Sequence, residues 1–347
     1  MNQIRLGQTD VTASSVGMGT WAIGGDSCWG ANNDEESIAA IQKARECGIT
    51  LIDTAPAYGL GHSEEVVGRA IHDARDSYVL ASKCGLVWDE EEGAVLTQRD
   101  GVTLRRVLSA ASLRRQLEQS LRRLQTDHLD LYITHWQTLP PFQTPIEETM
   151  QTLNAFVKEG KIRAIGVSNV TPEQIREYAK YGTIAVVQQK YSLLDRTCEQ
   201  NGILDVCREL GISFQAYSPL ERGMLSGKVR MDTTYTGTAK NGIRWYAPEQ
   251  RARVIAMLEQ FRPLCEKYDI SMASLVIAWT AARAENFSVL CGARKTAQVA
   301  DNAAGGSVAL CFPNRTRHIW IVSRASCCVK RRIRSGHKTE NDGKKKL

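Results

Sequence analysis

Short apolar runs alternate along the chain with longer amphipathic stretches. In the stretch 51–58, Leu51 and Ile52 run into Asp53, and a helix signal follows at 63–65. Apolar runs of this length are typical of parallel strands buried on both faces, and the stretches between them have helical spacing. The predicted strands are 16–19, 50–53, 78–82, 129–134, 162–167, 185–188, 213–217 and 288–291. The predicted helices include 34–46 with Asp34 as its N-cap, 111–124, 149–159, 172–180, 203–210 and 272–282.

Eight strand and helix units in about 300 residues favour a closed (β/α)8 TIM barrel, an α/β fold, over residues 1–310. Residues 4–6 and 11–13 are separated by a turn and predict an N-terminal β-hairpin. A doubly wound sheet would instead place a three-glycine dinucleotide fingerprint after its first strand. The segment Gly17-Met18-Gly19-Thr20 lacks the third glycine, so the barrel is the preferred fold.

The composition is that of an ordinary globular protein, with 43% hydrophobic and 24% charged residues among 347. No apolar run approaches the ~18 residues of a membrane span, and the first residues do not form a signal peptide. We therefore expect a cytoplasmic protein without a membrane partner. The ten cysteines form no C-x-x-C pair, so we predict reduced, mostly buried thiols and no metal site.

The net charge of +6 comes from the end of the chain. Residues 311–347 carry eleven Lys and Arg against two acidic residues, a net +9, which leaves −3 on the rest. A basic isoelectric point is therefore no argument for a nucleic-acid partner, and none is predicted. Because residues 311–347 lack helical periodicity, we predict a basic, atypical tail that is disordered or loosely packed and adds nothing to the fold.

Polar residues stand where the predicted strands end. The carboxyl ends of all barrel strands meet on one face, where barrel enzymes hold their active sites. Each of these residues alone has an ordinary structural explanation, such as a turn or a hydrogen-bonded core position. Their coincidence on one face predicts a site. The residues are Trp21, Asp53, Lys83, His135, Ser168, Asn169, Gln188, Tyr217 and Ser218.

A catalytic chemistry can be argued from four residues near these ends. A Tyr has a free pKa near ~10, and a neighbouring ammonium would lower the pKa of Tyr58. Lys83 can supply that ammonium, Asp53 can hold Lys83 charged, and His135 can orient a carbonyl oxygen. The reaction that suits this set is reduction of a carbonyl, with a hydride from a nicotinamide and a proton from Tyr58.

Seven motifs follow one another along the chain. They are G-x-G-T-W at 17–21, L-I-D-T-A-x-x-Y at 51–58, S-K at 82–83, D-L-Y-x-x-H-W at 130–136, G-K-I-R-A-I-G-V-S-N at 160–169, Y-S-P-L at 217–220, and G-A-R-K at 292–295 with D-N at 301–302. They resemble, in the same order and over residues 1–309, the motifs of the aldo-keto reductase family. The resemblance is greatest to bacterial members that reduce small aldehydes such as methylglyoxal.

The resemblance implies roles for individual residues. Tyr58 is the implied proton donor, and Asp53, Lys83 and His135 complete a catalytic tetrad. The implied cofactor-binding residues are Thr20, Trp21, Ser168, Asn169, Gln188, Tyr217, Ser218, Leu220, Gly292, Arg294, Gln298 and Asn302. Trp29, Trp88 and Trp136 lie on segments that meet at the same mouth, and we expect them to wall a substrate pocket.

The cofactor is predicted to be NADPH, with NADH possible. Arg294 and Lys295 stand where two cations can pair with the 2′-phosphate of the adenosine ribose. The family often has Lys-Ser where this chain has Gly292-Ala293, and Arg in place of Gln298, which leaves a thinner phosphate pocket. The substrate is expected to be a small carbonyl compound. Arg222 and Lys228 are near enough to the mouth to leave open the possibility of a phosphorylated substrate.

Two other classes of protein remain open on the sequence alone. One is a non-catalytic, nicotinamide-binding barrel that regulates another protein, although such a sensor need not keep all four tetrad residues. The other is a phosphosugar isomerase or aldolase barrel. Such a barrel would bind phosphate with a pair of glycines late in the chain, and Gly292-Ala293 supplies only one of the two. Whether the protein is a monomer or a homo-oligomer is left undetermined.

Overall fold

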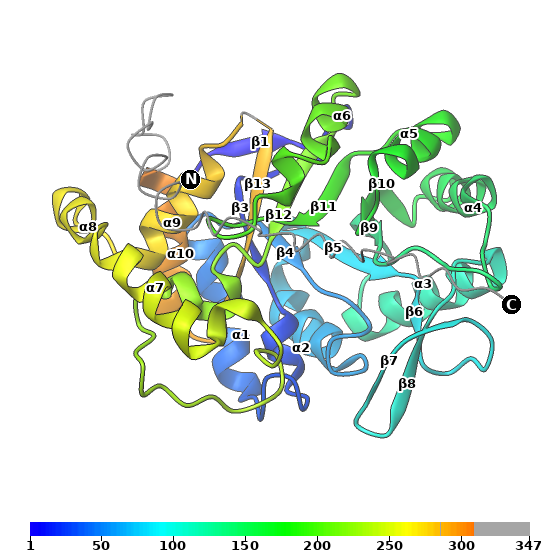
Figure 1. The fold of residues 1–347 in the computed structure, drawn as a ribbon. Helices are drawn as coiled ribbons and strands as arrows, with labels where there is room; N and C mark the ends of the chain where they lie inside the picture. Colours follow the sequence, from blue (N-terminus) through cyan, green and yellow to red (C-terminus); the bar gives the residue numbers. More distant parts are fainter. Residues whose placement is uncertain (285, 309–347) are drawn as a thin grey trace, which may run out of the picture.

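The computed structural model describes residues 1–284 and 286–308, and within them eight parallel strands close into a barrel (Figure 1). The barrel order is β10-β11-β12-β13-β3-β4-β5-β9, which confirms the predicted (β/α)8 fold. The predicted tail, 311–347, lies outside the described residues. The strands are β3 (Val16–Gly19), β4 (Leu51–Asp53), β5 (Val79–Cys84), β9 (Leu129–Thr134), β10 (Ile162–Ser168), β11 (Val186–Lys190), β12 (Ser213–Tyr217) and β13 (Phe287–Gly292).

Helices surround the barrel. The α-helices are α1 (Asp34–Glu46), α2 (His62–Ile71), α3 (Ala110–Leu124), α4 (Ile146–Lys158), α5 (Pro172–Tyr181), α6 (Ile203–Glu209), α7 (Pro248–Glu259), α8 (Arg262–Tyr268), α9 (Met272–Ala281) and α10 (Thr296–Val308). Short 3-10 helices are η1 (Trp21–Gly24), η2 (His72–Ser77), η3 (Thr197–Glu199), η4 (Glu221–Ser226) and η5 (Arg244–Tyr246). Helices α7, α8 and α10 add to those predicted from the sequence.

Local capping explains where several helices begin. Helix α5 has a capping box, in which Thr171 and Gln174 satisfy each other's backbone N–H groups, and Pro172 occupies the first helical position. The predicted cap of α1 was wrong by one residue. Asn33 is the N-cap, because its side chain accepts a hydrogen bond from the N–H of Glu36, and Asp34 is already helical.

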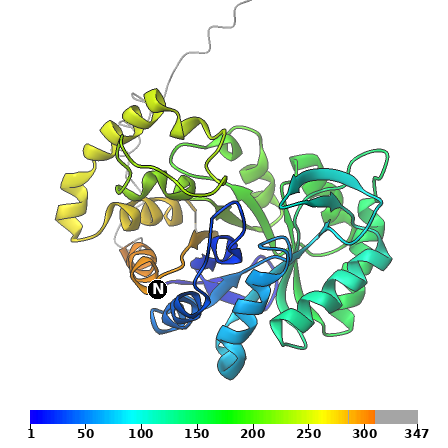
Figure 2. The same cartoon turned by 90° about the horizontal axis from the view of Figure 1, so that it is seen from below.

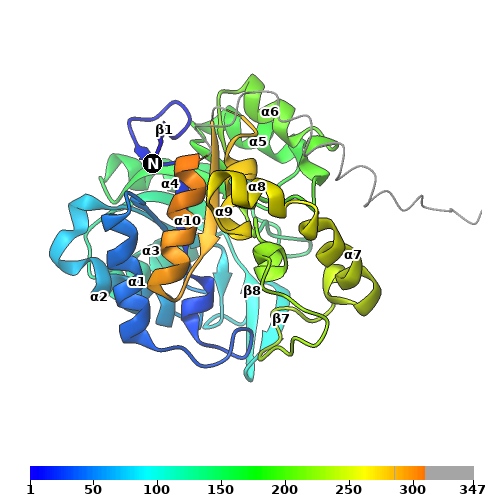
Figure 3. The same cartoon turned by 90° about the vertical axis from the view of Figure 1, so that its left-hand side faces the viewer.

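Helix α10 lies beside α1 and α9 on the outside of the barrel, as Figure 3 shows. Its close approach depends on two glycines. A Cβ on Gly305 would lie 2.8 Å from Ile277 of α9, and one on Gly306 would lie 2.9 Å from Val16 of β3. Among the described residues, no helix is long and apolar enough to cross a membrane. The predicted cytoplasmic location stays a prediction.

The predicted hairpin closes the amino-terminal end of the barrel. Strands β1 (Gln3–Arg5) and β2 (Thr12–Ser14) pair in antiparallel register, and Ile4 and Leu6 share a buried cluster with Leu131 of β9. Among the described residues this end is filled by apolar side chains, and a cavity opens at the carboxyl ends of the strands.

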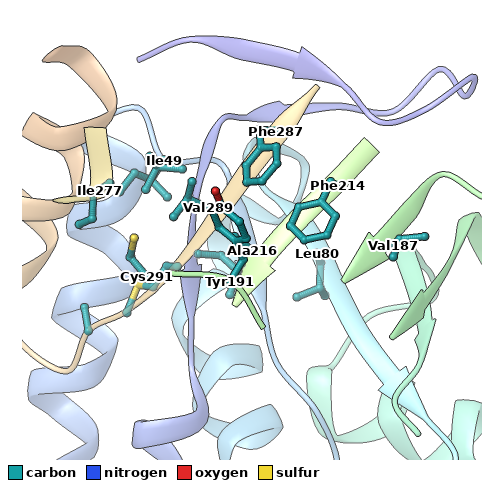
Figure 4. Packing of buried hydrophobic residues seen from close by; sticks show 14 of the residues in the cluster. Ile49, Leu80, Val187, Tyr191, Phe214, Ala216, Ile277, Phe287, Val289 and Cys291 are labelled. Atoms are coloured by element: carbon teal, nitrogen blue, oxygen red, sulfur yellow. The ribbon is translucent and has the colours of Figure 1, made fainter. Parts of the chain in front are cut away.

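The larger core lies between the barrel and its helices. Figure 4 shows Phe214 and Phe287 from neighbouring strands, with ring centroids 4.7 Å apart, and Tyr191 beside them at 5.3 Å from Phe287. Each large apolar side chain buried in this way contributes roughly 1.5–3 kcal/mol to folding. This packing makes the barrel a rigid support for side chains at the strand ends.

A three-stranded antiparallel sheet is inserted between β5 and α3, and the sequence analysis did not predict it. It consists of β6 (Leu86–Val87), β7 (Ala94–Arg99) and β8 (Val102–Arg106). Asp100 and Gly101 form the turn between β7 and β8, both with positive φ, as a two-residue hairpin requires. In Figure 2 this cyan hairpin and the yellow-green loop after β12 lie on either side of the dark blue loop after β3.

Candidate active site

A cavity of about 570 Å³ opens at the carboxyl ends of the strands. Most of the site residues predicted from the sequence line this cavity. They are Thr20, Trp21, Trp29, Asp53, Tyr58, His135, Trp136, Ser168, Asn169, Gln188, Tyr217, Ser218, Leu220, Gly292, Arg294, Gln298 and Asn302. Lys83 lies behind the cavity wall and is fully buried. Trp88 does not line the cavity but packs against the cluster that contains Leu86 and Leu104.

Asp53 and Lys83 form a buried ion pair. Strands β4 and β5 are neighbours in the barrel, which brings the end of one beside the end of the other. Lys83 Nζ donates to Asp53 Oδ1 at 2.6 Å and to the Thr54 carbonyl at 2.8 Å. The two side chains are 0% and 4% exposed, so neither charge would be stable there without the other. Burial lowers the pKa of Lys83, and the Asp53 carboxylate opposes that shift.

Tyr58 and His135 lie above this pair, half-buried in the cavity wall. Lys83 Nζ is 5.0 Å from the centroid of the Tyr58 ring. The rings of Tyr58 and His135 are nearly perpendicular, with centroids 5.8 Å apart. The loop of Tyr58 packs directly on the loop after β3, since a Cβ on Gly24 would lie only 2.6 Å from the Gly59 nitrogen. Three strand ends thus bring one phenol, one ammonium and one imidazole together.

The pKa of Tyr58 is shifted upward, opposite to the direction expected from the sequence. Burial raises the pKa of Tyr58 well above its ordinary value, and the Asp53 carboxylate adds to the rise. Lys83 directs two of its donors to Asp53 and to the Thr54 carbonyl, while its Nζ atom lies 5.0 Å from the centroid of the Tyr58 ring. Tyr58 therefore keeps its proton at neutral pH.

His135 is uncharged at neutral pH. Burial, and then the nearby Lys83 charge, hold the pKa of His135 well below its ordinary value. Within the described part of the chain its Nδ1 atom is buried and has no hydrogen-bond partner. Because Nδ1 is buried, Nε2 is the ring nitrogen through which His135 can reach a ligand in the cavity.

A network of amides links the neighbouring strand ends. Asn169 donates to the His135 carbonyl at 2.8 Å and to Ser168 Oγ at 3.1 Å. The Tyr217 hydroxyl donates to Asn169 Oδ1 at 2.8 Å. Asn169 has a φ of 55°, a left-handed conformation that Asn tolerates better than most residues. The backbone conformation thus aims the Asn169 side chain across the cavity wall.

The cavity floor fits a flat, extended ligand such as a dinucleotide. Gly19 and Gly292 are paired neighbours in β3 and β13 and both line the cavity. A Cβ on either glycine would meet no atom closer than 3.9 Å, so a side chain there would occupy the cavity itself. The cavity also runs from His135 to Arg294, so polar groups are available at both ends.

The far end of the cavity mixes cations with carboxylates. The Arg294 guanidinium donates to the Ala31 carbonyl at 3.3 Å, and Lys295 Nζ lies 3.6 Å from a carboxylate oxygen of Glu36. Asp301 lines the cavity, with Lys228 Nζ 3.6 Å from its carboxylate. Gln298 accepts hydrogen bonds from the backbone N–H groups of Arg294 and Lys295, the two residues before α10.

Two further cations line the cavity beside its aromatic wall. The Trp21 and Trp29 rings meet edge to face at 5.3 Å, and Trp21 lies 6.2 Å from Tyr58. The Arg222 guanidinium lies 4.8 Å from the Trp21 ring centroid, and Lys240 Nζ lies 5.4 Å from that of Trp29. Sequence reasoning missed Lys240, because the loop before α7 has no periodicity that indicates what it covers.

The sequence analysis also missed residues that the inserted sheet brings to the cavity. Leu86, Leu96, Thr97, Arg99 and Leu104 come from β6, β7 and β8 and line the cavity next to the aromatic wall. The dipeptide Asp100-Gly101 is a hairpin signal that could have indicated this sheet.

The sequence and structure match known reductases. Residues 15–310 match the model of the Aldo/keto reductase family. The chain is 44% identical over 312 residues to an NADH-specific methylglyoxal reductase of Escherichia coli, covering 89% of this chain and 95% of that protein. A glycerol dehydrogenase from Gluconobacter oxydans superposes with a TM-score of 0.79 at 33% identity, covering 93% and 94% of the two chains. A Klebsiella pneumoniae aldo/keto reductase solved with NADP and acetate has a TM-score of 0.67 at 26% identity, covering 94% and 95%.

The barrel and these relatives define a nicotinamide-dependent oxidoreductase that reduces aldehydes and ketones. The chain belongs to the aldo/keto reductase family. The family resemblance drawn from the seven motifs is thereby confirmed. Membership also separates the chain from the isomerase and aldolase barrels that the sequence left open.

Proposed function

We propose that this enzyme reduces small aldehydes such as methylglyoxal to alcohols, with Tyr58 as the proton donor. The observation that carries the proposal is the buried Asp53–Lys83 pair, which places an ammonium 5.0 Å from the Tyr58 ring at the cavity wall. The 44% identity to a methylglyoxal reductase supports the substrate class.

The four tetrad residues have different roles in proton transfer. Tyr58 is protonated at neutral pH and gives its phenolic proton to the carbonyl oxygen as that oxygen becomes an alkoxide. Lys83 then stabilises the phenolate, and Asp53 keeps Lys83 charged in its buried position. His135, neutral, donates an Nε2–H hydrogen bond to the same carbonyl oxygen. A bound reduced nicotinamide supplies the hydride.

The cofactor site that we propose follows the cavity lining. Ser168 and Asn169 hold the carboxamide of the nicotinamide, and the Tyr217 ring packs on the nicotinamide itself. Gln188, which also lines the cavity, contacts the carboxamide beside Ser168 and Asn169. The residues proposed for the remaining contacts are Thr20 and Trp21 at the nicotinamide end, Ser218, Leu220 and Lys240 along the pyrophosphate, and Gly292, Arg294, Gln298 and Asn302 at the adenosine end.

We propose NADH rather than NADPH as the preferred cofactor, which revises the preference drawn from the sequence. Lys295 Nζ lies 3.6 Å from Glu36, and Asp301, 3.6 Å from Lys228 Nζ, places a carboxylate at the same end of the cavity. A carboxylate there repels a 2′-phosphate but accepts a hydrogen bond from a free 2′-hydroxyl. The name of the 44% identical relative, an NADH-specific enzyme, supports the same choice.

The test is oxidation of NADH with methylglyoxal, with wild type compared to Tyr58→Phe. We expect turnover to fall roughly 10²- to 10⁴-fold while NADH binding, followed by fluorescence, is retained. Tyr181→Phe, whose hydroxyl donates to Glu177 on the surface of α5, is the matched control and keeps wild-type turnover. Unchanged turnover in Tyr58→Phe would contradict the assigned role. NADH binding without turnover in wild type, across several aldehydes, would contradict the proposed substrate class.

A further inference from the structure

Arg99 joins three segments that are far apart in the sequence. It stands at the end of β7, next to the hairpin turn, and its side chain is only 15% exposed. One guanidinium nitrogen lies 3.2 Å from Asp26 Oδ2 and donates to Cys28 Sγ at 3.2 Å. The other terminal nitrogen donates to the Ala57 carbonyl at 2.8 Å. One planar side chain thus ties the hairpin to the loop after β3 and to the loop after β4.

Each of the two loops carries an aromatic residue of the cavity. Ala57 directly precedes Tyr58, so its carbonyl belongs to the peptide bond that orients the Tyr58 backbone. Asp26 organises the other loop, because its side chain accepts from the N–H of Cys28 at 2.9 Å and its carbonyl accepts from the N–H of Trp29 at 3.1 Å. Trp29 packs on Trp21, and Trp21 packs on Tyr58, so the two loops are also joined through their aromatic rings.

The neighbouring residue of the hairpin strengthens the connection. Asp100 Oδ2 accepts from the N–H of Ser27 at 3.4 Å, so the tip of the hairpin holds the loop after β3 at two adjacent positions. Arg99 also lines the cavity, so it acts at the wall of the site. A guanidinium suits this place because its rigid fork can bind a carboxylate and a carbonyl at the same time.

We infer that Arg99 is a positioning residue for the reduction, holding Tyr58 and the Trp29 loop in one fixed relation. The inference rests on the proposed function, in which Tyr58 delivers the proton. It assigns the inserted hairpin a role in catalysis beyond walling the substrate. Asp26, with a carboxylate oxygen 3.2 Å from Arg99, is the counter-ion of the guanidinium.

The test compares Arg99→Met, Arg99→Lys and Asp26→Asn with wild type in NADH-dependent reduction of methylglyoxal. Small displacements of a catalytic group cost large factors in rate, so we expect kcat to fall roughly tenfold to a hundredfold in Arg99→Met. Arg99→Lys keeps the positive charge but cannot bridge both loops. We therefore expect its kcat to lie between that of Arg99→Met and that of wild type. NADH affinity stays within about twofold in all three variants, since Arg99 contacts Asp26, Cys28 and Ala57, and none of these is proposed to hold the cofactor.

The matched control is Arg105→Met in the same hairpin. Arg105 donates to the Gly93 carbonyl at 3.3 Å, a contact made close to the inserted sheet and away from both loops. We expect this variant to keep wild-type kcat. An equal loss of kcat in Arg105→Met would overturn the inference, because the hairpin would then matter only as a folded unit.

Chemical rescue separates positioning from loss of fold. Arg99→Ala leaves a slot bounded by Asp26 and the Ala57 carbonyl, which free guanidinium ion can enter. We expect millimolar guanidinium, and not an equal concentration of sodium chloride, to restore part of the lost kcat. Loss of kcat that guanidinium does not reverse, together with an equal loss of NADH affinity, would overturn the inference.

The two proposals fail in different ways. If wild type turns over no carbonyl substrate, the proposed function fails, whatever the variants do. If wild type turns over methylglyoxal and the kcat of both Arg99→Met and Asp26→Asn stays within twofold of it, the proposed function stands and Arg99 is not a positioning residue.

Discussion

Gln188 donates its side-chain amide to Asp53 Oδ2 at 2.9 Å, while Lys83 holds the other carboxylate oxygen of Asp53 at 2.6 Å. The same amide nitrogen lies 2.6 Å from Gln215 Oε1. Asp53 is thus held from both sides by strands that are not adjacent to each other. The barrel interior supports the ion pair with a polar network, which is what a buried charge pair requires.

Removal of the Asp53 charge should destabilise the fold. Asp53→Asn leaves the Lys83 ammonium fully buried without its counter-ion, and breaking one partner of a buried pair costs about 3–5 kcal/mol. We expect this loss in the free energy of unfolding, measured by urea denaturation at pH 7. The double variant Asp53→Asn with Lys83→Met should recover part of it. A single variant within about 1 kcal/mol of wild type would mean that the pair contributes little.

Tyr58 should remain protonated throughout the neutral range. Its pKa is raised by burial and by Asp53, so kcat/KM for carbonyl reduction should show no decline from Tyr58 between pH 6 and 9. The neutral phenol is favoured in the folded state, so its contribution to stability is present below the ordinary pKa near ~10 and is lost as pH rises beyond it. Absorbance titration of wild type against Tyr58→Phe measures this directly. A difference in phenolate signal that appears below pH 9 would contradict the prediction.

His135 should make the fold sensitive to acid. Its pKa is lowered in the folded state, so its stabilising contribution is present above the ordinary pKa of ~6.5 and is lost as pH falls below that value. A single group of this kind changes the unfolding free energy by at most about 1.4 kcal/mol per pH unit. We expect His135→Gln to be less sensitive than wild type in urea unfolding between pH 7 and 5. The control is His72→Gln, because His72 is an exposed residue of η2. Equal slopes of the unfolding free energy against pH for wild type and His135→Gln would contradict the prediction.

The choice between NADH and NADPH should respond to Asp301. Removing its charge in Asp301→Asn lowers the repulsion of a 2′-phosphate and frees Lys228, which lies 3.6 Å away. A change of about 1 kcal/mol for such a partly exposed charge corresponds to roughly a fivefold gain in NADPH affinity. The ratio of the dissociation constants for NADH and NADPH measures this shift. Asp10→Asn, in the hairpin at the opposite end of the barrel, should leave the ratio unchanged, and an unchanged ratio in Asp301→Asn would show that Asp301 does not face the ribose.

Tyr217 and Asn169 should act together on cofactor binding. Tyr217→Phe removes the 2.8 Å hydrogen bond to Asn169 but keeps the ring, so we expect a modest loss of NADH affinity, about two- to tenfold. Asn169→Ala should lose more, because Ala in a left-handed conformation costs roughly 1 kcal/mol in addition to the lost amide contacts. Fluorescence titration with NADH gives both values. Asn169→Gly separates the two effects, and a Gly variant that binds as weakly as the Ala variant would mean that backbone strain plays no part.

The sequence alone determined the fold and the face on which the site lies. Strand spacing, helix spacing and the positions of Asp53, Lys83 and His135 at strand ends are local properties, because strand direction and side-chain period follow from the backbone. The parallel barrel then requires that these ends meet. This is why the predicted barrel was confirmed and why most of the predicted site residues line one cavity.

Only the tertiary structure decided which side chains touch one another. The pairing of Gln188 with Asp53, the upward shift of the Tyr58 pKa and the position of Trp88 outside the cavity depend on contacts between distant segments. Arg99 shows the physical reason. Its partner Asp26 is far from it in sequence, and no local pattern indicates that the two side chains meet. Desolvation acts on the assembled site, so neither pKa directions nor positioning contacts can be taken from strand periodicity.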